Sequence, residues 1–219
     1  MGSVYLATYR ATGTRAALKV MTDEAHRNAR YRRMFQREAE SLARLEHPNI
    51  VRVLDVGAVE AGSLAAERFG DGSPYLVMEY LNGQPPSAFF QARGRFGWPE
   101  LRHLLDDILG ALARAHALDV IHRDLKPNNL LIQGDPHGED WTATLFDFGI
   151  ARALDDLSVQ STTTSRGSVV GTPSFMAPEQ VLGDWRDEGP WTDLYALGCL
   201  TWRATTGEAP FSGGSDMGV

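Results

Sequence analysis

The sequence predicts an α+β protein with a small, strand-rich first lobe and a mostly helical second lobe. Apolar runs at residues 3–9, 15–21, 50–59 and 74–81 are typical of short strands, and all fall early in the chain of 219 residues. A long stripe of leucines over residues 98–118 then indicates an amphipathic helix. Because the strands come first and the helices follow, the order favours an α+β arrangement of two lobes.

The first two strands are joined by a turn at residues 11–14, whose glycine suits a tight reversal. The junction of the lobes is expected near residues 80–84, because Asn82-Gly83 and Pro85-Pro86 interrupt regular structure there. The stretch between the third and fourth strands is rich in Gly, Ala and Ser, and we expect an exposed loop.

Residues 28–46 are predicted to form a helix between the second and third strands. Glu38 lies on its apolar stripe, where a carboxylate requires a cationic partner. Lys19, in an otherwise apolar strand, is the natural candidate. The alternative is that both charges reach solvent independently along their aliphatic stems. The apolar positions of the stripe are Tyr31, Phe35, Leu42 and Leu45.

The second long helix, residues 98–118, carries one apolar stripe that we expect to face the core of the second lobe. Its members are Leu101, Leu104, Leu105, Ile108, Leu109, Leu112 and Ala115.

A run from Val120 to Asn129, followed by Asp147-Phe148-Gly149, places polar groups among apolar residues that should be buried. Burying an unpaired charge is costly, so these groups need a purpose other than stability. A nucleoside triphosphate with its metal ions would supply one. The polar groups are Asp124, Lys126, Asn129 and Asp147.

These motifs resemble those of the eukaryotic-type protein serine/threonine kinases, in the form found in bacteria. The resemblance implies a two-lobed kinase fold with an N-lobe at residues 1–80, a hinge at 81–85 and a C-lobe at 86–219. It further implies transfer of the γ-phosphoryl group of ATP, with Mg²⁺, to serine or threonine hydroxyls of protein substrates.

By this resemblance, Asp124 receives or orients the proton of the acceptor hydroxyl, and Lys126 faces the transferred phosphate. Thr172, in the run Gly171 to Glu179, contacts both of them, as in the serine/threonine branch of the family. Asn129 and Asp147 supply the oxygen ligands that Mg²⁺ prefers.

The first lobe is implied to hold the nucleotide. Lys19 contacts the α and β phosphates, Glu38 orients Lys19, and Ala17 packs against adenine. We expect these side chains and those of the second lobe to converge on one pocket. The other nucleotide-binding positions implied by the family are Gly2, Val4, Met78, Glu79, Leu81 and Leu131.

The segment from Asp147 to Glu179 matches the family's activation segment. Arg123 and Arg152 together resemble a phosphate receptor, so phosphorylation at Ser168, or at residues 162–164, is expected to order the segment. The alternative is an exposed polar loop without modification.

Three further residues are interpreted as structural. Asp193 either braces the backbone before Asp124, as in the family, or caps the N-terminus of an apolar helix. His122 is expected to be a packed core residue rather than a base. Cys199, the one cysteine, is expected to be a small core residue rather than a nucleophile.

Composition limits the other classes of function. A formal charge of −7 argues against a nucleic-acid binder. A single cysteine excludes an intrachain disulfide, so we expect a reducing, cytoplasmic location. We find no apolar run of about 18 residues that could span a membrane. The oligomeric state stays open.

Compared with the family, the sequence lacks the first glycines of the phosphate loop and the last helices of the C-lobe, so we expect a fragment. Glu179 is then expected to lack the arginine that pairs with it in the family. Two other functions stay open at this point: a catalytically impaired kinase-like module that binds nucleotide or partners, and a small-molecule phosphotransferase of related fold.

Overall fold

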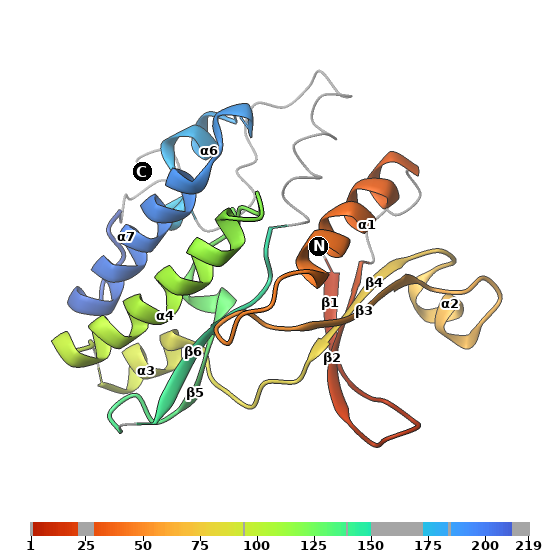
Figure 1. Ribbon diagram of the computed structural model, residues 1–219, viewed down its shortest axis with the longest axis horizontal. Coiled ribbons are helices and arrows are strands. Elements are labelled where there is room, and N and C mark those ends of the chain that lie inside the picture. The colour runs from red at the N-terminus through yellow and green to blue at the C-terminus, as the bar shows by residue number, and fades with distance from the viewer. Residues whose placement is uncertain are drawn as a thin grey trace. The chain divides into compact units, whose positions relative to one another are not determined.

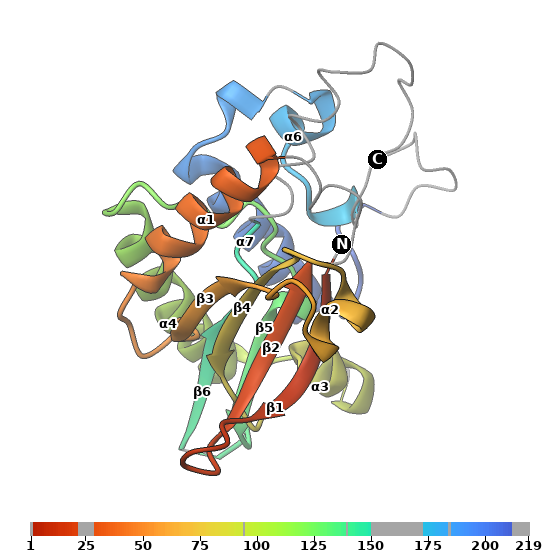
Figure 2. The same cartoon turned by 90° about the vertical axis from the view of Figure 1, so that its right-hand side faces the viewer.

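The structure is a computed structural model (Figures 1 and 2), and the chain divides into two compact units, Met1–Leu81 and Asn82–Val219. Each unit is described by itself. The residues that the structure describes are 2–21, 29–93, 95–138, 140–149, 173–183 and 185–211.

The first unit contains an antiparallel sheet with the strand order β1-β2-β4-β3. All four predicted strands are confirmed, although the third and fourth are shorter than expected. The hairpin of the first two is closed by Tyr9, whose N–H donates to Thr14 O (2.8 Å), and Gly13 adopts a φ of 72°. The strands are β1 (Gly2–Thr8), β2 (Arg15–Met21), β3 (Val53–Ala58) and β4 (Pro74–Glu79).

The predicted helix of the first unit is α1 (Ala29–Ala43), which packs against β3 and β4. Phe35, Leu42 and Leu45 are buried as predicted, although Leu45 lies just beyond the end of the helix. The side chain of Tyr31 lies outside the described residues.

The expectation of a loop between the third and fourth strands is wrong, because this stretch contains the short helix α2 (Leu64–Phe69). The Oγ of Ser63 accepts a hydrogen bond from the N–H of Ala66 (3.2 Å) and so caps the N-terminus. Gly70, at a φ of 89°, ends the helix. Leu, Ala and Glu between these caps are good helix formers, and they outweigh the loop-like composition of the flanks.

The described part of the second unit is mostly helical and contains a β-hairpin. Its longest helices lie side by side and contact each other, as Figure 1 shows for α4 in green and α7 in blue. The elements are α3 (Pro86–Arg93), α4 (Trp98–His116), η2 (Pro127–Asn129), β5 (Leu130–Gly134), β6 (Trp141–Leu145), η3 (Pro173–Phe175), α6 (Pro178–Leu182), η4 (Trp185–Asp187) and α7 (Pro190–Thr206).

The buried face of α4 differs from the predicted stripe at two positions. Leu109 is 44% exposed, and Leu105 is only half-buried. At about 100° per residue, Leu109 points well away from the line through Leu104, Ile108 and Leu112. Ala111 takes its place and is fully buried. This face packs against β6 and α7.

Within the described part of the chain, none of the helices has both the length and the apolar character needed to cross a bilayer.

Candidate functional site

Five of the six predicted nucleotide-binding residues of β1, β2 and β4 lie on one face of the first sheet, and the sixth, Glu79, is paired with Ala16 and lies on the other. Val4 is paired with Lys19, and Ala17 is paired with Met78. Directly opposed residues of antiparallel strands project to the same side, and residues two apart on a strand also share a side. Gly2 also lies on this side, because it is two residues from Val4 and is paired with Met21. The sheet therefore gathers these five positions on one surface.

Gly2 is required by close packing between the strands. A Cβ at this position would lie 2.8 Å from the carbonyl oxygen of Val20 and 2.9 Å from the sulfur of Met21. Lys19 and Ala17 are half-buried on this face, whereas Val4 is 61% exposed. This face of the sheet is thus partly accessible to solvent around the side chain of Lys19.

At the end of β4, Glu79 is tied to the residue before β3. Its N–H donates to the carbonyl oxygen of Arg52 (3.0 Å), and its Oε1 accepts from the N–H of Arg52 (2.7 Å). The Glu79 amide is therefore not available to a purine. An adenine contact by this segment has to use a carbonyl group or the backbone of Leu81.

Glu38 lies half-buried on α1, as its position on the apolar stripe requires. In the described residues, however, no ion pair joins Glu38 to Lys19, so their pairing stays a prediction.

In the second unit, Asp124 is held between a cation and an amide. The Nζ of Lys126 donates to Oδ2 of Asp124 (2.7 Å), and the Nδ2 of Asn129 donates to the same oxygen (2.9 Å) and to the Asp124 carbonyl (2.7 Å). The side chains of Asp124 and Lys126 are 25% and 19% exposed, so the cluster can be reached from solvent. Three of the predicted catalytic and metal-binding residues are therefore in direct contact.

Asn129 and the segment that carries Asp147 lie next to each other. The N–H of Phe146 donates to the carbonyl oxygen of Asn129 (3.1 Å), and Asp147 adopts a left-handed φ of 59°. The amide nitrogen of Asn129 is used on Asp124, which leaves its amide oxygen as the metal-binding atom. An amide oxygen and a carboxylate from adjacent segments fit Mg²⁺, which prefers oxygen ligands and needs few from protein.

His122 is a packed core residue, as predicted. It is fully buried, and its ring centroid lies 4.5 Å from that of Phe148, with the ring planes tilted by 36°. Its Nε2 lies 3.2 Å from the Phe146 carbonyl oxygen, and its Nδ1 accepts from the N–H of Asp124 (3.3 Å). A neutral ring with its proton on Nε2 satisfies both contacts. Burial lowers the pKa of His122, which agrees with the neutral form.

Asp193 braces the backbone that leads to Asp124, and the alternative of a helix cap is wrong because α7 begins earlier, at Pro190. Its Oδ2 accepts from the N–H of His122 (2.8 Å), and its Oδ1 accepts from the N–H of Arg123 (2.8 Å). The Nε2 of His116 lies 2.7 Å from Oδ2. Asp193 is fully buried, so these contacts replace all of its hydration.

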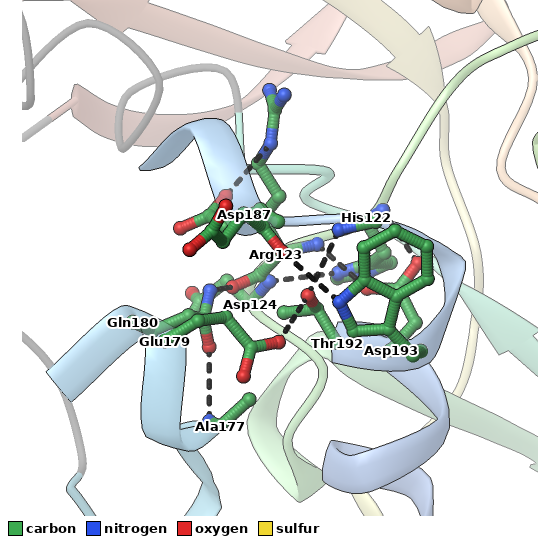
Figure 3. Close-up of polar contacts among 12 residues, drawn as sticks. His122, Arg123, Asp124, Ala177, Glu179, Gln180, Asp187, Thr192 and Asp193 are labelled. Atoms are coloured by element: carbon green, nitrogen blue, oxygen red, sulfur yellow. Dashed lines mark hydrogen bonds and ion pairs between the residues drawn. The ribbon is translucent and has the colours of Figure 1, made fainter. Parts of the chain in front are cut away.

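Arg123 is held by residues that the sequence did not single out (Figure 3). The Nε2 of Gln180 donates to the Arg123 carbonyl oxygen (2.8 Å), and the Oε1 of Gln180 accepts from the N–H of Ala177 (3.2 Å). The guanidinium of Arg123 forms an ion pair with the carboxylate of Glu188. The contacts of His116, Gln180 and Glu188 join segments far apart in the chain, so no local pattern could have indicated them.

Glu179, for which the sequence predicts the loss of an arginine partner, accepts a hydrogen bond from a hydroxyl group. The Oγ1 of Thr192 donates to its Oε1 at 2.6 Å, and Figure 3 shows the two side chains pointing toward each other. Glu179 is half-buried, so a single strong donor satisfies part of its charge.

Cys199 is a buried residue of α7, as predicted. Burial raises the pKa of its thiol, which keeps the sulfur protonated and unreactive.

Several predicted residues are not tested by these contacts. Leu131 is half-buried on β5, opposite Thr144 of β6. Thr172, Arg152 and the candidate phosphorylation sites Ser168 and residues 162–164 lie outside the described residues.

Comparison with known proteins gives matches along the whole chain. A family model described as "Protein kinase domain" matches residues 1–218. The probable serine/threonine-protein kinase PknB of Bifidobacterium longum is 36% identical over 221 residues, covering 100% of this chain and 30% of that protein. The serine/threonine-protein kinase PknA of Mycobacterium tuberculosis is 36% identical over 220 residues, covering 100% of this chain and 47% of that protein.

Solved structures match as well. The crystal structure of Rad53 1-466 in complex with AMP-PNP superposes with a TM-score of 0.74 at 29% identity, over 99% of this chain and 48% of that one. The Mycobacterium tuberculosis PknI kinase domain gives 0.70 at 28% identity, over 97% of this chain and 72% of that one. The chain thus spans less than half the length of the two curated relatives.

Proposed function

The chain belongs to the protein kinase domain family, and on that premise we propose that it transfers the γ-phosphoryl group of ATP to serine or threonine hydroxyls of protein substrates. The two-lobed α+β kinase fold predicted from the sequence is confirmed by the structural matches. The curated relatives over its whole length are named serine/threonine-protein kinases.

The observation that carries the proposal is the contact of Lys126 and Asn129 with Asp124. Phosphoryl transfer needs an aligned nucleophile and neutralisation of the spreading negative charge, with little covalent help from protein. Asp124 orients the acceptor hydroxyl and accepts its proton. Lys126, beside it, places a positive charge where the transferred phosphoryl group passes.

Asn129 and Asp147 are the residues that would hold Mg²⁺, through an amide oxygen and a carboxylate. When bound, the ion neutralises negative charge on the phosphates of ATP. In the first unit, Lys19 binds the phosphates and Glu38 orients it. The positions that surround the nucleotide are Gly2, Val4, Ala17, Met78, Glu79, Leu81 and Leu131.

The choice of serine and threonine over tyrosine is assigned to Lys126 and Thr172, the pair typical of that branch. Residues 81–85 act as the hinge between the lobes. The substrates are proteins, and the reaction takes place in the cytoplasm, where a chain with one cysteine needs no disulfide.

The test is transfer of labelled γ-phosphate to a generic basic protein by the wild type and by Asp124→Asn. The substitution keeps the size of the side chain and removes the proton acceptor, so transfer should fall about 10²- to 10⁴-fold. Asp106→Asn is the matched control, because that carboxylate is 70% exposed on α4, and it should transfer at the wild-type rate.

Transfer that survives Asp124→Asn would refute the catalytic assignment. ATP binding without transfer by any variant would instead favour a non-catalytic, nucleotide-binding module.

A further inference from the structure

Arg123, the residue before the proposed catalytic aspartate, is fixed at its backbone by two segments. Its N–H donates to Asp193 of α7 (2.8 Å), and its carbonyl oxygen accepts from Gln180 of α6 (2.8 Å). Arg123 also adopts a left-handed φ of 63°, which a non-glycine residue keeps only when its surroundings enforce it. Because Asp124 is the next residue, any shift of Arg123 moves the carboxylate of Asp124.

The side chain of Arg123 has a third attachment, to a carboxylate. Its Nε lies 3.0 Å from Oε2 of Glu188, close enough for an ion pair, although the angle is outside the range of a hydrogen bond. The side chain of Glu188 is only 4% exposed and that of Arg123 is 23% exposed. In such a place water screens the two charges poorly, so they attract each other more strongly than a surface pair would.

The position of this pair matters because a guanidinium binds phosphate and carboxylate by the same contacts. Arg123 is the residue expected from the sequence to receive a phosphate on the activation segment. In the structure, a carboxylate from the loop before α7 already neutralises it. In Figure 3 the terminal nitrogens of Arg123 point away from the labelled residues, so the pairing uses only the Nε side.

We propose that Glu188 is a positioning residue for phosphoryl transfer: it supplies within the chain the negative charge on Arg123 that a phosphorylated activation segment would otherwise supply. Transfer by this protein therefore depends little on phosphorylation of residues 158–168. The inference rests on the proposed function, and it adds the requirement of a negative charge at Glu188, which phosphoryl transfer alone does not need.

The experiment crosses two changes in the full chain. The first is Glu188→Gln, which keeps the shape and removes the charge. The second replaces every serine and threonine from Ser158 to Ser168 by alanine, so that no phosphate can form there. Transfer of labelled γ-phosphate gives kcat and KM for all four combinations. Asp187→Asn, the exposed carboxylate one residue earlier, is the matched control, and Glu188→Asp tests rescue by charge alone.

With Glu188 present, the alanine replacements should lower kcat less than about threefold. With Glu188→Gln they should lower it at least about tenfold, because Arg123 then has neither carboxylate nor phosphate, and the KM for ATP should stay within about twofold. Glu188→Asp should recover most of the loss, and Asp187→Asn should behave as the wild type. A merely structural Glu188 would lower activity equally in both backgrounds, and that result overturns the proposal.

A second measurement separates this inference from the proposed function. Urea unfolding of Arg123→Gln, Glu188→Gln and the double variant gives the coupling between the two side chains. We expect a coupling of at least about threefold in the unfolding equilibrium constant. A coupling near onefold would show that Glu188 does not act through Arg123, and it would leave the kinase assignment intact. A coupled pair in a chain that transfers no phosphate in any form would overturn the kinase assignment, and with it the role of Glu188.

Discussion

Replacing Asp193 by alanine tests whether the segment of Asp124 is held by a buried carboxylate. Asp193 is fully buried and accepts hydrogen bonds from the N–H groups of His122 and Arg123, both at 2.8 Å. The substitution leaves two amides without acceptors, that of His122 buried and that of Arg123 partly buried, at about 1–3 kcal/mol each. It also leaves His116 without the oxygen that lies 2.7 Å from its Nε2. We expect the free energy of unfolding to fall by about 3–5 kcal/mol.

The assay is urea unfolding followed by tryptophan fluorescence. All five tryptophans lie in the second unit, so the signal reports the unit that contains Asp193. With an m-value of about 2 kcal/mol per molar urea, the midpoint should fall by about 2 M. Asp193→Asn should show a smaller loss, because its one amide oxygen can still accept from one of the two N–H groups.

Asp106→Asn serves as the control for a lost carboxylate. Asp106 is exposed on α4, 3.7 Å from Arg102, and such surface pairs contribute at most about 1 kcal/mol. A loss below about 1 kcal/mol for Asp193→Ala, no larger than that of the control, would refute the bracing role.

Three further predictions concern pH dependence, metal binding and a buried hydrogen bond. Burial lowers the pKa of His122, so near pH 6.5 the ring is protonated in the unfolded chain and stays neutral in the folded one. The free energy of unfolding therefore falls as the pH drops below 6.5, by up to about 1.4 kcal/mol per pH unit. Urea unfolding of His122→Gln from pH 8 to 5 should lack this part of the slope. Asn129→Ala should raise the Mg²⁺ concentration for half-maximal transfer by about tenfold or more. The same substitution at its exposed neighbour, Asn128→Ala, should leave that concentration unchanged. Thr192→Val removes the donor to Glu179 and the acceptor of the Gly189 N–H, and should cost about 2 kcal/mol in urea unfolding.

Each of these predictions has a contrary outcome. Equal pH slopes for the wild type and His122→Gln would show that the ring takes up a proton in the folded state. An unchanged Mg²⁺ requirement for Asn129→Ala would remove that residue from the metal site. For Thr192, the comparison is Thr201→Val, whose hydroxyl donates only to a carbonyl of its own helix; equal losses for the two would show that the bond to Glu179 contributes nothing.

The features that sequence could predict are those set by local period and short motifs. The alternation of β2 put Ala17 and Lys19 on one face, and the pairing with β1 and β4 added Val4 and Met78 to it. The contacts of Asp124 with Lys126 and Asn129 span at most five residues, so the motif contained them.

Sequence reasoning failed where local signals were weak or the partner was remote. The helix α2 is only six residues long, which is too short to show a clear apolar period. The local signal that indicated it was the N-cap residue Ser63. Leu109 is as apolar as its neighbours, and only the angle around α4 sets it apart. The two interpretations of Asp193 could not be separated, because the bracing contacts join residues about 70 positions apart.

The central claim is that Asn129 and Asp147 bind the metal ion that accompanies the nucleotide. Its most direct test is a crystal structure of the chain with a non-hydrolysable ATP analogue and Mg²⁺. We expect oxygens of Asn129 and Asp147 about 2.1 Å from the ion. A metal held by other residues would contradict the account.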